Sequence, residues 1–269
     1  MTNIILVGCG KMGGALLEGW RTNRAAEAFV VVEPMTGATD QLADASGVTV
    51  VADFESIPPA FSADAIVFAV KPQTMGVVVP PYAAMAQRAV TLSIAAGTPI
   101  RFFESLFGDE AAVVRAMPNT PAAIGRGISV LCANASTSDD QRQLSETLMQ
   151  AAGVVDWIDD EDQMDAVTAL SGSGPAYVFH LIEAMAAAGE ALGLSSEMAA
   201  KSALETVAGA GELARLASDS PSVLRQNVTS PGGTTAAALA ILMADDGQIA
   251  LMKKAMTAAR DRGRELAKG

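Results

Sequence analysis

The chain has 269 residues, half of them hydrophobic, which suits one large domain or two modest ones. Its formal net charge of −12 disfavours nucleic acid or an anionic membrane surface as a partner. Two cysteines far apart in the sequence and a single histidine argue against a Cys/His zinc site, so we expect no metal.

The beginning of the sequence and its apolar runs bear on cellular location. No basic segment with a cleavage site precedes the first apolar run, so we expect no signal peptide. The longest apolar run, near residues 177–188, is interrupted by His180 and Glu183, so we expect no transmembrane helix. Two separated thiols suit a reducing compartment, and we predict a cytoplasmic protein.

The first half of the sequence alternates between short apolar runs and helical patterns. NIILVG predicts a buried strand, followed by a helix over residues 11–21. Further strands are predicted at AFVVVEP, VTVVA, ADAIVFAV, AVTLSIAAG and AAVVRAMPNTP. GISVLCAN predicts a last strand, antiparallel and at the edge of the sheet. This alternation predicts an α/β domain with the doubly wound parallel sheet of the Rossmann fold.

After about Asp159 the pattern becomes entirely helical. Helices are predicted over residues 175–192, 196–217, 234–244 and 248–266. Pro175 fits a first helical turn, and Ser195 is a suitable N-cap. The acidic run DDEDQMD is expected to mark the boundary as a solvated helix start. We therefore predict a dinucleotide-binding domain over residues 1–159 and an all-α domain over residues 160–269.

A glycine-rich loop follows the first predicted strand. Its G-x-G-x-x-G pattern stands between a strand and a helix, which is the context that dinucleotide binding requires. The glycines permit a tight turn, a close approach to a pyrophosphate and close helix packing, and the helix start supplies N–H donors. A glycine-rich turn without a ligand is the alternative. The predicted cofactor residues of this loop are Gly8, Cys9, Gly10, Lys11, Met12 and Gly13.

Glu33 ends the second predicted strand, 20 residues after Gly13. An acidic side chain there accepts hydrogen bonds from the adenosine ribose and repels the 2′-phosphate of NADPH. No lysine or arginine stands just after it. Glu33 therefore favours NADH over NADPH, unless it is simply a solvated acid at the end of a strand.

Later strands end in residues that suit the same edge of the sheet, where ligands bind in folds of this type. Lys71 is placed to meet a cofactor phosphate or ribose, or else is a surface lysine. Asn119 lies in a rigid turn between two prolines and is expected to face the nicotinamide. The predicted cofactor residues of these strand ends are Ala69, Val70, Lys71, Pro72, Ala95, Ala96, Gly97 and Asn119.

The stretch VTSPGGTT near the end of the sequence predicts an anion site. Ser230 is expected to be the N-cap and Pro231 the first helical residue. Gly232 and Gly233 would leave the first-turn amides unshielded, able to hold a carboxylate. Thr234 and Thr235 add hydroxyl groups.

SGSGPAY, residues 171–177, predicts another helix start with small residues and hydroxyls. Its candidate substrate-binding residues are Ser171, Ser173 and Gly174. Two glycine-rich helix caps without a ligand are the alternative to an anion site.

The shortage of candidate general bases narrows the types of reaction that the sequence supports. His180 lies inside a predicted helix, where a lone histidine is more often structural. A protonated imine is already a strong hydride acceptor, so orientation can contribute about 7–11 kcal/mol of the catalysis. Reduction of a carbon–nitrogen double bond therefore suits the sequence better than oxidation of a hydroxy acid.

The motifs GCGKMG, AVKPQ, SIAAG, RAMPNTP, ALSGSGPAY and VTSPGGTT together resemble the pyrroline-5-carboxylate reductase family from end to end. The resemblance implies reduction of Δ1-pyrroline-5-carboxylate to L-proline with NADPH or NADH. It also implies a Rossmann domain followed by an all-α C-terminal dimerisation domain, in dimers often stacked into decamers.

By matching positions, Ser230, Gly233, Thr234 and Thr235 would hold the substrate carboxylate and ring nitrogen, with Thr235 beside the nitrogen as the catalytic candidate. Lys71 and residues 95–97 would line the cofactor. Glu33 stands where many relatives carry a small polar residue, which argues against a preference for NADPH.

Other functions stay open on the sequence alone. A β-hydroxyacid dehydrogenase would need a lysine base in the helical domain, for which Lys201 is the candidate. A six-membered cyclic imine is an alternative substrate. A protein that senses NAD(H) without turnover is a third possibility.

Overall fold

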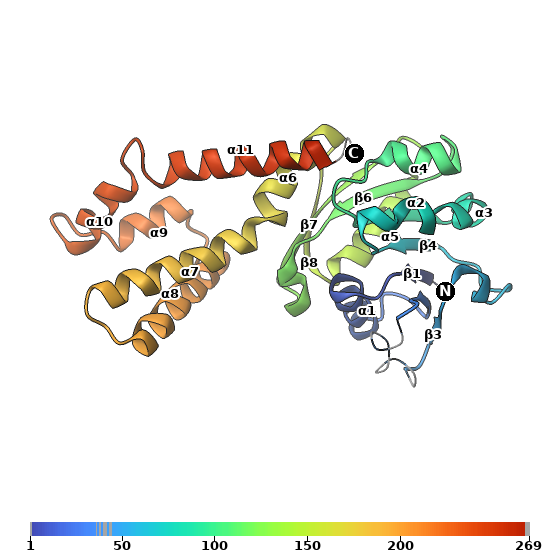
Figure 1. The fold of residues 1–269 in the computed structure, drawn as a ribbon, viewed down its shortest axis with the longest axis horizontal. Coiled ribbons are helices and arrows are strands. Elements are labelled where there is room, and N and C mark those ends of the chain that lie inside the picture. The colour runs from blue at the N-terminus through green and yellow to red at the C-terminus, as the bar shows by residue number, and fades with distance from the viewer. Residues whose placement is uncertain (1, 36, 38, 40–41, 43–44, 267–269) are drawn as a thin grey trace. The chain divides into compact units, whose positions relative to one another are not determined.

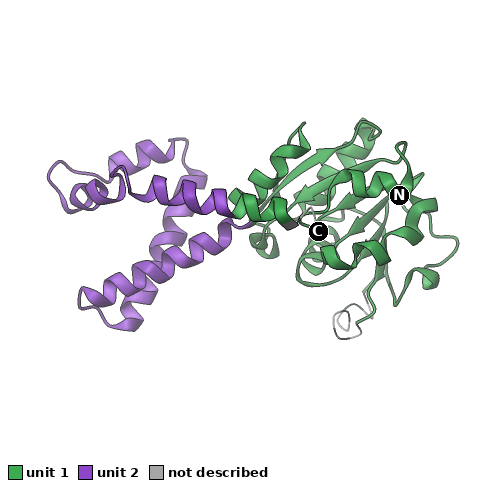
Figure 2. Cartoon of the chain, turned by 45° about the horizontal axis from the view of Figure 1, so that its top comes forward, with its two compact units in different colours: residues 1–172, 259–269 green, residues 173–258 purple. Residues whose placement is uncertain are grey.

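The computed structural model describes residues 2–35, 37, 39, 42 and 45–266, which form two compact units. Unit 1 comprises residues 1–172 and 259–269, and unit 2 comprises residues 173–258 (Figure 2). Contacts thus group the segment 160–172 and the end of the last helix with the sheet. The predicted domain division after residue 159 stays a prediction.

The described residues of unit 1 form one eight-stranded sheet with the order β3-β2-β1-β4-β5-β6-β7-β8 (Figure 1). Neighbouring strands are parallel except for the antiparallel pair β6 and β7. The strands are β1 Asn3–Val7, β2 Ala28–Val32, β3 Val48–Val51, β4 Ala65–Phe68, β5 Val90–Ser93, β6 Val113–Met117, β7 Gly127–Ala133 and β8 Gly153–Trp157. The doubly wound α/β prediction is confirmed.

The strand predicted from GISVLCAN is β7, and its antiparallel direction is confirmed. Its predicted place at the edge of the sheet is wrong, because β8 pairs with it in parallel on the outer side. The β8 sequence GVVDW alternates between half-buried and exposed positions and carries Asp156. It therefore lacks the continuous apolar run by which the inner strands are recognised.

Helices bury both faces of the sheet, which explains the unbroken apolar runs of its central strands. Ile4 and Leu6 of β1 pack in one cluster with Trp20 of α1, whereas Ile5 and Val7 pack in the other with Phe103 of α4. The helices of unit 1 that precede unit 2 are α1 Lys11–Asn23, α2 Met75–Val78, α3 Ala83–Ala86, α4 Ile100–Phe107, α5 Asp139–Gln150 and α6 Met164–Val167.

Unit 2 is helical, as predicted. Its helices are α7 Gly174–Ala191, α8 Ser196–Leu216, α9 Pro221–Asn227, α10 Thr234–Leu242 and most of α11 Gln248–Leu266. Ser195 caps α8 as predicted, with its hydroxyl accepting from the amide of Met198 at 3.3 Å. The short helix α9 was not predicted. Helices α7 and α10 contain no buried residue, although both are rich in apolar side chains.

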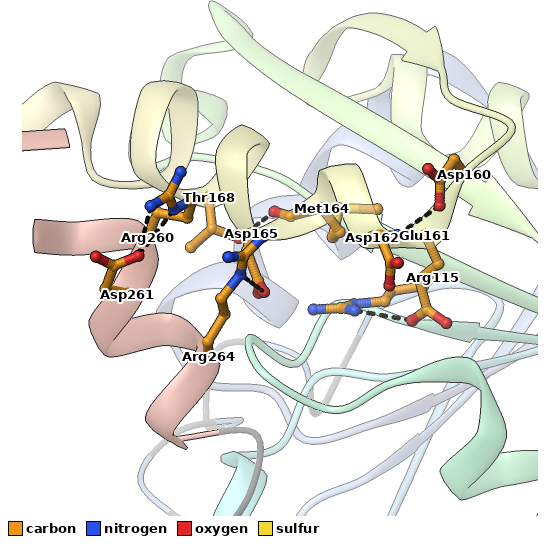
Figure 3. A network of polar contacts seen from close by, with 10 residues as sticks. All are labelled: Arg115, Asp160, Glu161, Asp162, Met164, Asp165, Thr168, Arg260, Asp261 and Arg264. Atoms are coloured by element: carbon orange, nitrogen blue, oxygen red, sulfur yellow. Dashed lines mark hydrogen bonds and ion pairs between the residues drawn. The ribbon is translucent and has the colours of Figure 1, made fainter. Parts of the chain in front are cut away.

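A polar network ties α6 and the end of α11 into unit 1 (Figure 3). Arg115 of β6 pairs with Glu161 at 2.8 Å, and the same Glu161 oxygen accepts from the first amide of α4 at 2.9 Å. Arg264 of α11 pairs with Asp165 of α6 at 3.5 Å. The acidic run expected to be a solvated helix start therefore supplies two carboxylates that join separate elements.

Candidate functional site

The register of the sheet brings the predicted cofactor residues to one edge. Val7, the last residue of β1, is paired with the last residues of β2 and β4, Val32 and Phe68. Phe68 is in turn paired with Ser93, the last residue of β5. The loops that follow these four strands therefore start side by side. The switch point lies at β1, because β2 and β3 follow on one side of it and the chain then crosses to β4 on its other side.

The glycine loop has the close packing that its pattern predicts. A Cβ on Gly13 would lie 2.3 Å from the carbonyl oxygen of Gly8, so only glycine fits there. Gly10 is the N-cap residue of α1, and a Cβ there would meet nothing within 4 Å. No side chain of the described residues caps the start of α1. The first amides of α1 therefore adjoin open space, as a pyrophosphate requires.

Glu33 is joined to the glycine loop. Its Oε2 accepts a 2.7 Å hydrogen bond from the amide of Cys9, and its Oε1 accepts one of 3.0 Å from the amide of Met35. These two bonds fix the carboxylate at the end of β2. Burial, and after it the Glu33 charge, raises the pKa of the Cys9 thiol, so Cys9 stays protonated at neutral pH and is a poor nucleophile.

The remaining predicted cofactor residues form turns after β4 and β5. Lys71 is exposed and precedes a short 3₁₀ turn, Pro72–Thr74, which begins at Pro72. Its ammonium group makes no ion pair with another described residue. Ala95 is buried and Ala96 is exposed. Half-buried Ala69 and Val70 start the turn after β4.

Asn119, which follows β6, uses both ends of its side-chain amide within unit 1. Its Nδ2 donates to the carbonyl of Ser171 at 3.1 Å, and its Oδ1 accepts from the amide of Ile128 at 3.0 Å. The side chain thus bridges the beginning of β7 and the segment before α7. Its predicted contact with the nicotinamide stays a prediction.

The predicted helix start in SGSGPAY is more complex than the sequence suggests. Residues Thr168–Gly172 form a π-helical turn, and α7 begins only at Gly174, with Pro175 in its first turn as predicted. The Ser171 hydroxyl donates to the carbonyl of Val167 at 3.0 Å. The helix start proper is thus Ser173 and Gly174, in unit 2, whereas Ser171 belongs to unit 1. Single π-helical turns occur often at functional sites.

The prediction that Ser230 caps α10 is wrong. Gly232 has φ +69°, a left-handed conformation that interrupts the chain, and the amide of Gly233 donates to the carbonyl of Ser230 at 3.0 Å. Gly233 is the N-cap residue, and α10 begins at Thr234. Within the part of the chain that the structure describes, no side chain caps the start of α10. The first-turn amides therefore include those of Thr234, which is exposed, and Thr235, which is half-buried.

Two residues that support the site were not singled out from the sequence. Arg115 is buried in β6, and its partner Glu161 holds the first turn of α4, which follows the predicted cofactor turn after β5. A charged residue in the apolar run VVRAM is the signal that could have indicated a buried pair. The alternative base Lys201 is exposed on α8, and His180 is exposed beside Glu183.

The described residues form neither a metal centre nor a membrane-spanning helix. No group of three or more His, Cys, Asp and Glu side chains in this part of the chain is placed to hold a metal ion. No helix in the same part is long and apolar enough to cross a bilayer.

Two family models match the chain. One, described as pyrroline-5-carboxylate reductase dimerisation, matches residues 161–266. The other, described as NADP oxidoreductase coenzyme F420-dependent, matches residues 3–97. The second range covers the glycine loop, Glu33 and the turns after β4 and β5.

Curated relatives and solved structures match nearly the whole chain. The chain is 42% identical to the pyrroline-5-carboxylate reductase of Pseudomonas aeruginosa, covering 98% of this chain and 96% of that protein. A structure of the Coxiella burnetii pyrroline-5-carboxylate reductase aligns with TM-score 0.91 and 36% identity over 98% of both chains. The Plasmodium falciparum pyrroline carboxylate reductase with NADP bound aligns with TM-score 0.80 and 29% identity over 99% of this chain and 98% of that one.

Proposed function

The chain belongs to the pyrroline-5-carboxylate reductase family, and we propose that its Ser230–Thr235 turn binds the substrate carboxylate while Thr235 serves the ring nitrogen. The enzyme is an NAD(P)H-dependent oxidoreductase that reduces Δ1-pyrroline-5-carboxylate to L-proline in proline biosynthesis. The observation that carries this function is the 42% identity over almost the full length of both chains.

The residues at the carboxyl edge of the sheet fit a nicotinamide cofactor. The open helix start at Gly10 and Lys11 suits the pyrophosphate, and the turns that contain Lys71 and Ala96 would line the remainder. When bound, the reduced cofactor supplies the hydride. The protein's own part is to hold that cofactor and to present the imine to it.

The choice between NADH and NADPH depends, in our proposal, on Glu33. Two backbone amides hold its carboxylate at the end of β2, where the adenosine ribose is expected. A carboxylate fixed there repels a 2′-phosphate, so we propose a preference for NADH. The Plasmodium relative with NADP bound shows that a member of the fold accepts NADP, and this chain is expected to use it less well.

The substrate proposal uses a helix start instead of a cationic side chain. The first amides of α10 lie at the positive end of the helix dipole, and no side chain of the described residues caps them. They therefore suit a carboxylate. Thr235 is half-buried, and its hydroxyl is proposed to donate to the ring nitrogen and orient the imine. Orientation, together with this hydrogen bond to the imine nitrogen, is proposed to supply most of the catalysis.

Self-association involves unit 2, which lies wholly within the residues that the dimerisation model matches. Helices α7 and α10 expose apolar side chains, including Phe179 at 60% and Ile241 at 75%. Large exposed apolar patches often mark protein–protein interaction sites. We propose a dimer that stacks into a decamer, and sedimentation velocity distinguishes the two sizes. A cytoplasmic location stays a prediction.

The function is tested by initial rates measured from nicotinamide absorbance. Pyrroline-5-carboxylate is compared with its six-membered homologue, piperideine carboxylate, and each is measured with NADH and with NADPH. We expect the five-membered imine to be the better substrate and NADH the better cofactor. No oxidation of reduced cofactor with either imine would contradict the proposal and favour a nucleotide sensor.

A further inference from the structure

We infer that Asn119 is a positioning residue for the reaction, which holds the peptide of Ser171 at the edge of the sheet where the cofactor is bound. This inference rests on the proposed function of that edge. It differs from the direct cofactor contact expected from the sequence, because both ends of the Asn119 amide are already used by the protein.

The geometry gives Asn119 a bridging role. Residue 119 follows β6 at the edge where the parallel strands end, and its side chain joins two separate segments. Its Oδ1 accepts from Ile128 in β7, and its Nδ2 donates to Ser171 in the π-helical turn. Residue 175, four positions after Ser171, is a proline without an N–H, so the Ser171 carbonyl lacks its regular α-helical donor, and the Asn119 side-chain amide satisfies it.

The π-helical turn is also packed closely against the same strand end. A Cβ on Gly172 would lie 2.5 Å from the Cε of Met117, the last residue of β6. The turn is therefore held by the side-chain hydrogen bond from Asn119 to the carbonyl of Ser171 and by the contact of Met117 at residue 172. The first helical residues of unit 2 follow at once, beginning with Gly174.

Asn134 provides an internal comparison for Asn119. Its Oδ1 accepts from Val113 of β6 at 3.1 Å, and its Nδ2 donates to the carbonyl of Ala111 at 2.9 Å. Asn134 follows β7, whereas Asn119 follows β6. Because these neighbouring strands are antiparallel, the two residues lie at opposite ends of the strands. The same pair of side-chain hydrogen bonds therefore occurs once at the strand ends proposed to bind the cofactor and once at the opposite strand ends.

The test is the matched pair of variants Asn119→Asp and Asn134→Asp in the full-length enzyme. In both variants aspartate retains an acceptor for the strand amide but places an oxygen against a backbone carbonyl, and at residue 134 also against the Glu104 carboxylate. For Asn119→Asp we expect kcat/KM for pyrroline-5-carboxylate to fall about 10- to 100-fold, the loss typical of misplaced reacting groups. Cofactor dissociation constants from fluorescence titration should stay within about twofold of the wild type. The reason is that the Asn119 side-chain amide bonds other protein groups and not the cofactor. Asn134→Asp should lower Tm while kcat/KM changes little.

Hydrogen exchange gives a readout that is independent of turnover. Amides in residues 168–178 should exchange faster in Asn119→Asp than in Asn134→Asp, at a temperature where both are folded. The uncharged variant Asn119→Ser serves the same purpose if Asn119→Asp is insoluble.

Three results would overturn the inference. They are unchanged exchange in residues 168–178, cofactor affinity that falls as far as kcat/KM, or equal kinetic losses in the two aspartate variants. A wild-type enzyme without imine reductase activity would instead refute the proposed function, while the exchange measurement still tests the bridge.

Discussion

The amide of Cys9 in the glycine loop donates a 2.7 Å hydrogen bond to the Glu33 carboxylate at the end of β2. This bond joins the loop proposed for the pyrophosphate to the residue proposed for the adenosine ribose. Glu33 therefore has two separable properties, its negative charge and its capacity to accept the Cys9 amide. Substitutions that remove one property or both distinguish their effects.

Replacing Glu33 should change cofactor preference. Glu33→Gln keeps an acceptor for the Cys9 amide and removes the charge, so the ratio of kcat/KM with NADPH to that with NADH should rise about tenfold or more. Glu33→Ser also removes the repulsion but loses the bond to the loop, so its KM for NADH should rise as well. An unchanged ratio in both variants, from initial rates with each cofactor, would remove Glu33 from cofactor selection.

Replacing Thr235 tests the group proposed beside the ring nitrogen. Thr235→Ala should lower kcat by about 10- to 100-fold, because an acceptor at the reacting centre loses its hydrogen-bond donor. Thr235→Ser keeps the hydroxyl and should retain most of the activity. Cofactor affinity should be unchanged in both. Equal activities of the alanine and serine variants would show that the hydroxyl has no role.

Adjacent glycines of α1 provide a test of the loop packing. Gly13→Ala would place a Cβ 2.3 Å from the Gly8 carbonyl oxygen and should abolish cofactor binding or prevent folding. Gly14→Ala places its Cβ 3.8 Å from the nearest atom, the Cys9 carbonyl oxygen, and should stabilise the helix by up to about 1 kcal/mol. Thermal unfolding and cofactor titration measure both effects. A well-folded Gly13→Ala enzyme with normal cofactor affinity would contradict the close approach.

The Arg115–Glu161 pair should contribute to stability more than surface pairs do. Glu161→Gln weakens contacts to the buried Arg115 guanidinium and to the amide of Ile100, and should lower the free energy of unfolding by about 1–3 kcal/mol. The exposed pair Arg21–Glu18 is the control, since Glu18→Gln should cost about 0.5 kcal/mol or less. Denaturant unfolding measures both variants. Equal losses would show that burial of the Arg115 pair is unimportant.

The Cys9 thiol should make unfolding depend on pH in the alkaline range. Burial and then Glu33 raise its pKa, so the folded enzyme holds the proton more tightly than the unfolded chain. The free energy of unfolding should therefore decline as pH rises above the ordinary thiol value of about 8.5. Cys9→Ala should make this decline shallower between pH 8 and 10, as measured in urea. Identical slopes would contradict the contribution of Cys9.

Much of the fold could be predicted because its information is local. Buried parallel strands such as NIILV have continuous apolar sequences, and the glycine pattern marks the loop that follows. Strand β8 is not predicted from the sequence, because its half-buried and exposed positions alternate and give only a weak strand signal. The position of β8 outside β7 depends on pairing between distant segments, which no local pattern records.

The candidate site was predictable in composition but less so in geometry. The glycine loop and Glu33 meet because the strand ends are in register, as expected for this sheet. The sequence predicts Ser230 as the cap of α10, because Ser-Pro is a common helix start. In the structure Gly232 is left-handed, and the helix begins only at Thr234. The hydrogen bonds of Asn119 and Glu161 join residues far apart in sequence, so they become visible only in three dimensions.

The central claim, that the turn at residues 230–235 holds the substrate, is tested most directly by a crystal structure of the enzyme with proline and oxidised cofactor. We predict the proline carboxylate within hydrogen-bonding distance of the Thr234 and Thr235 amides, with its nitrogen beside the Thr235 hydroxyl. Proline bound at another location, while these amides contact only protein or water, would contradict the claim.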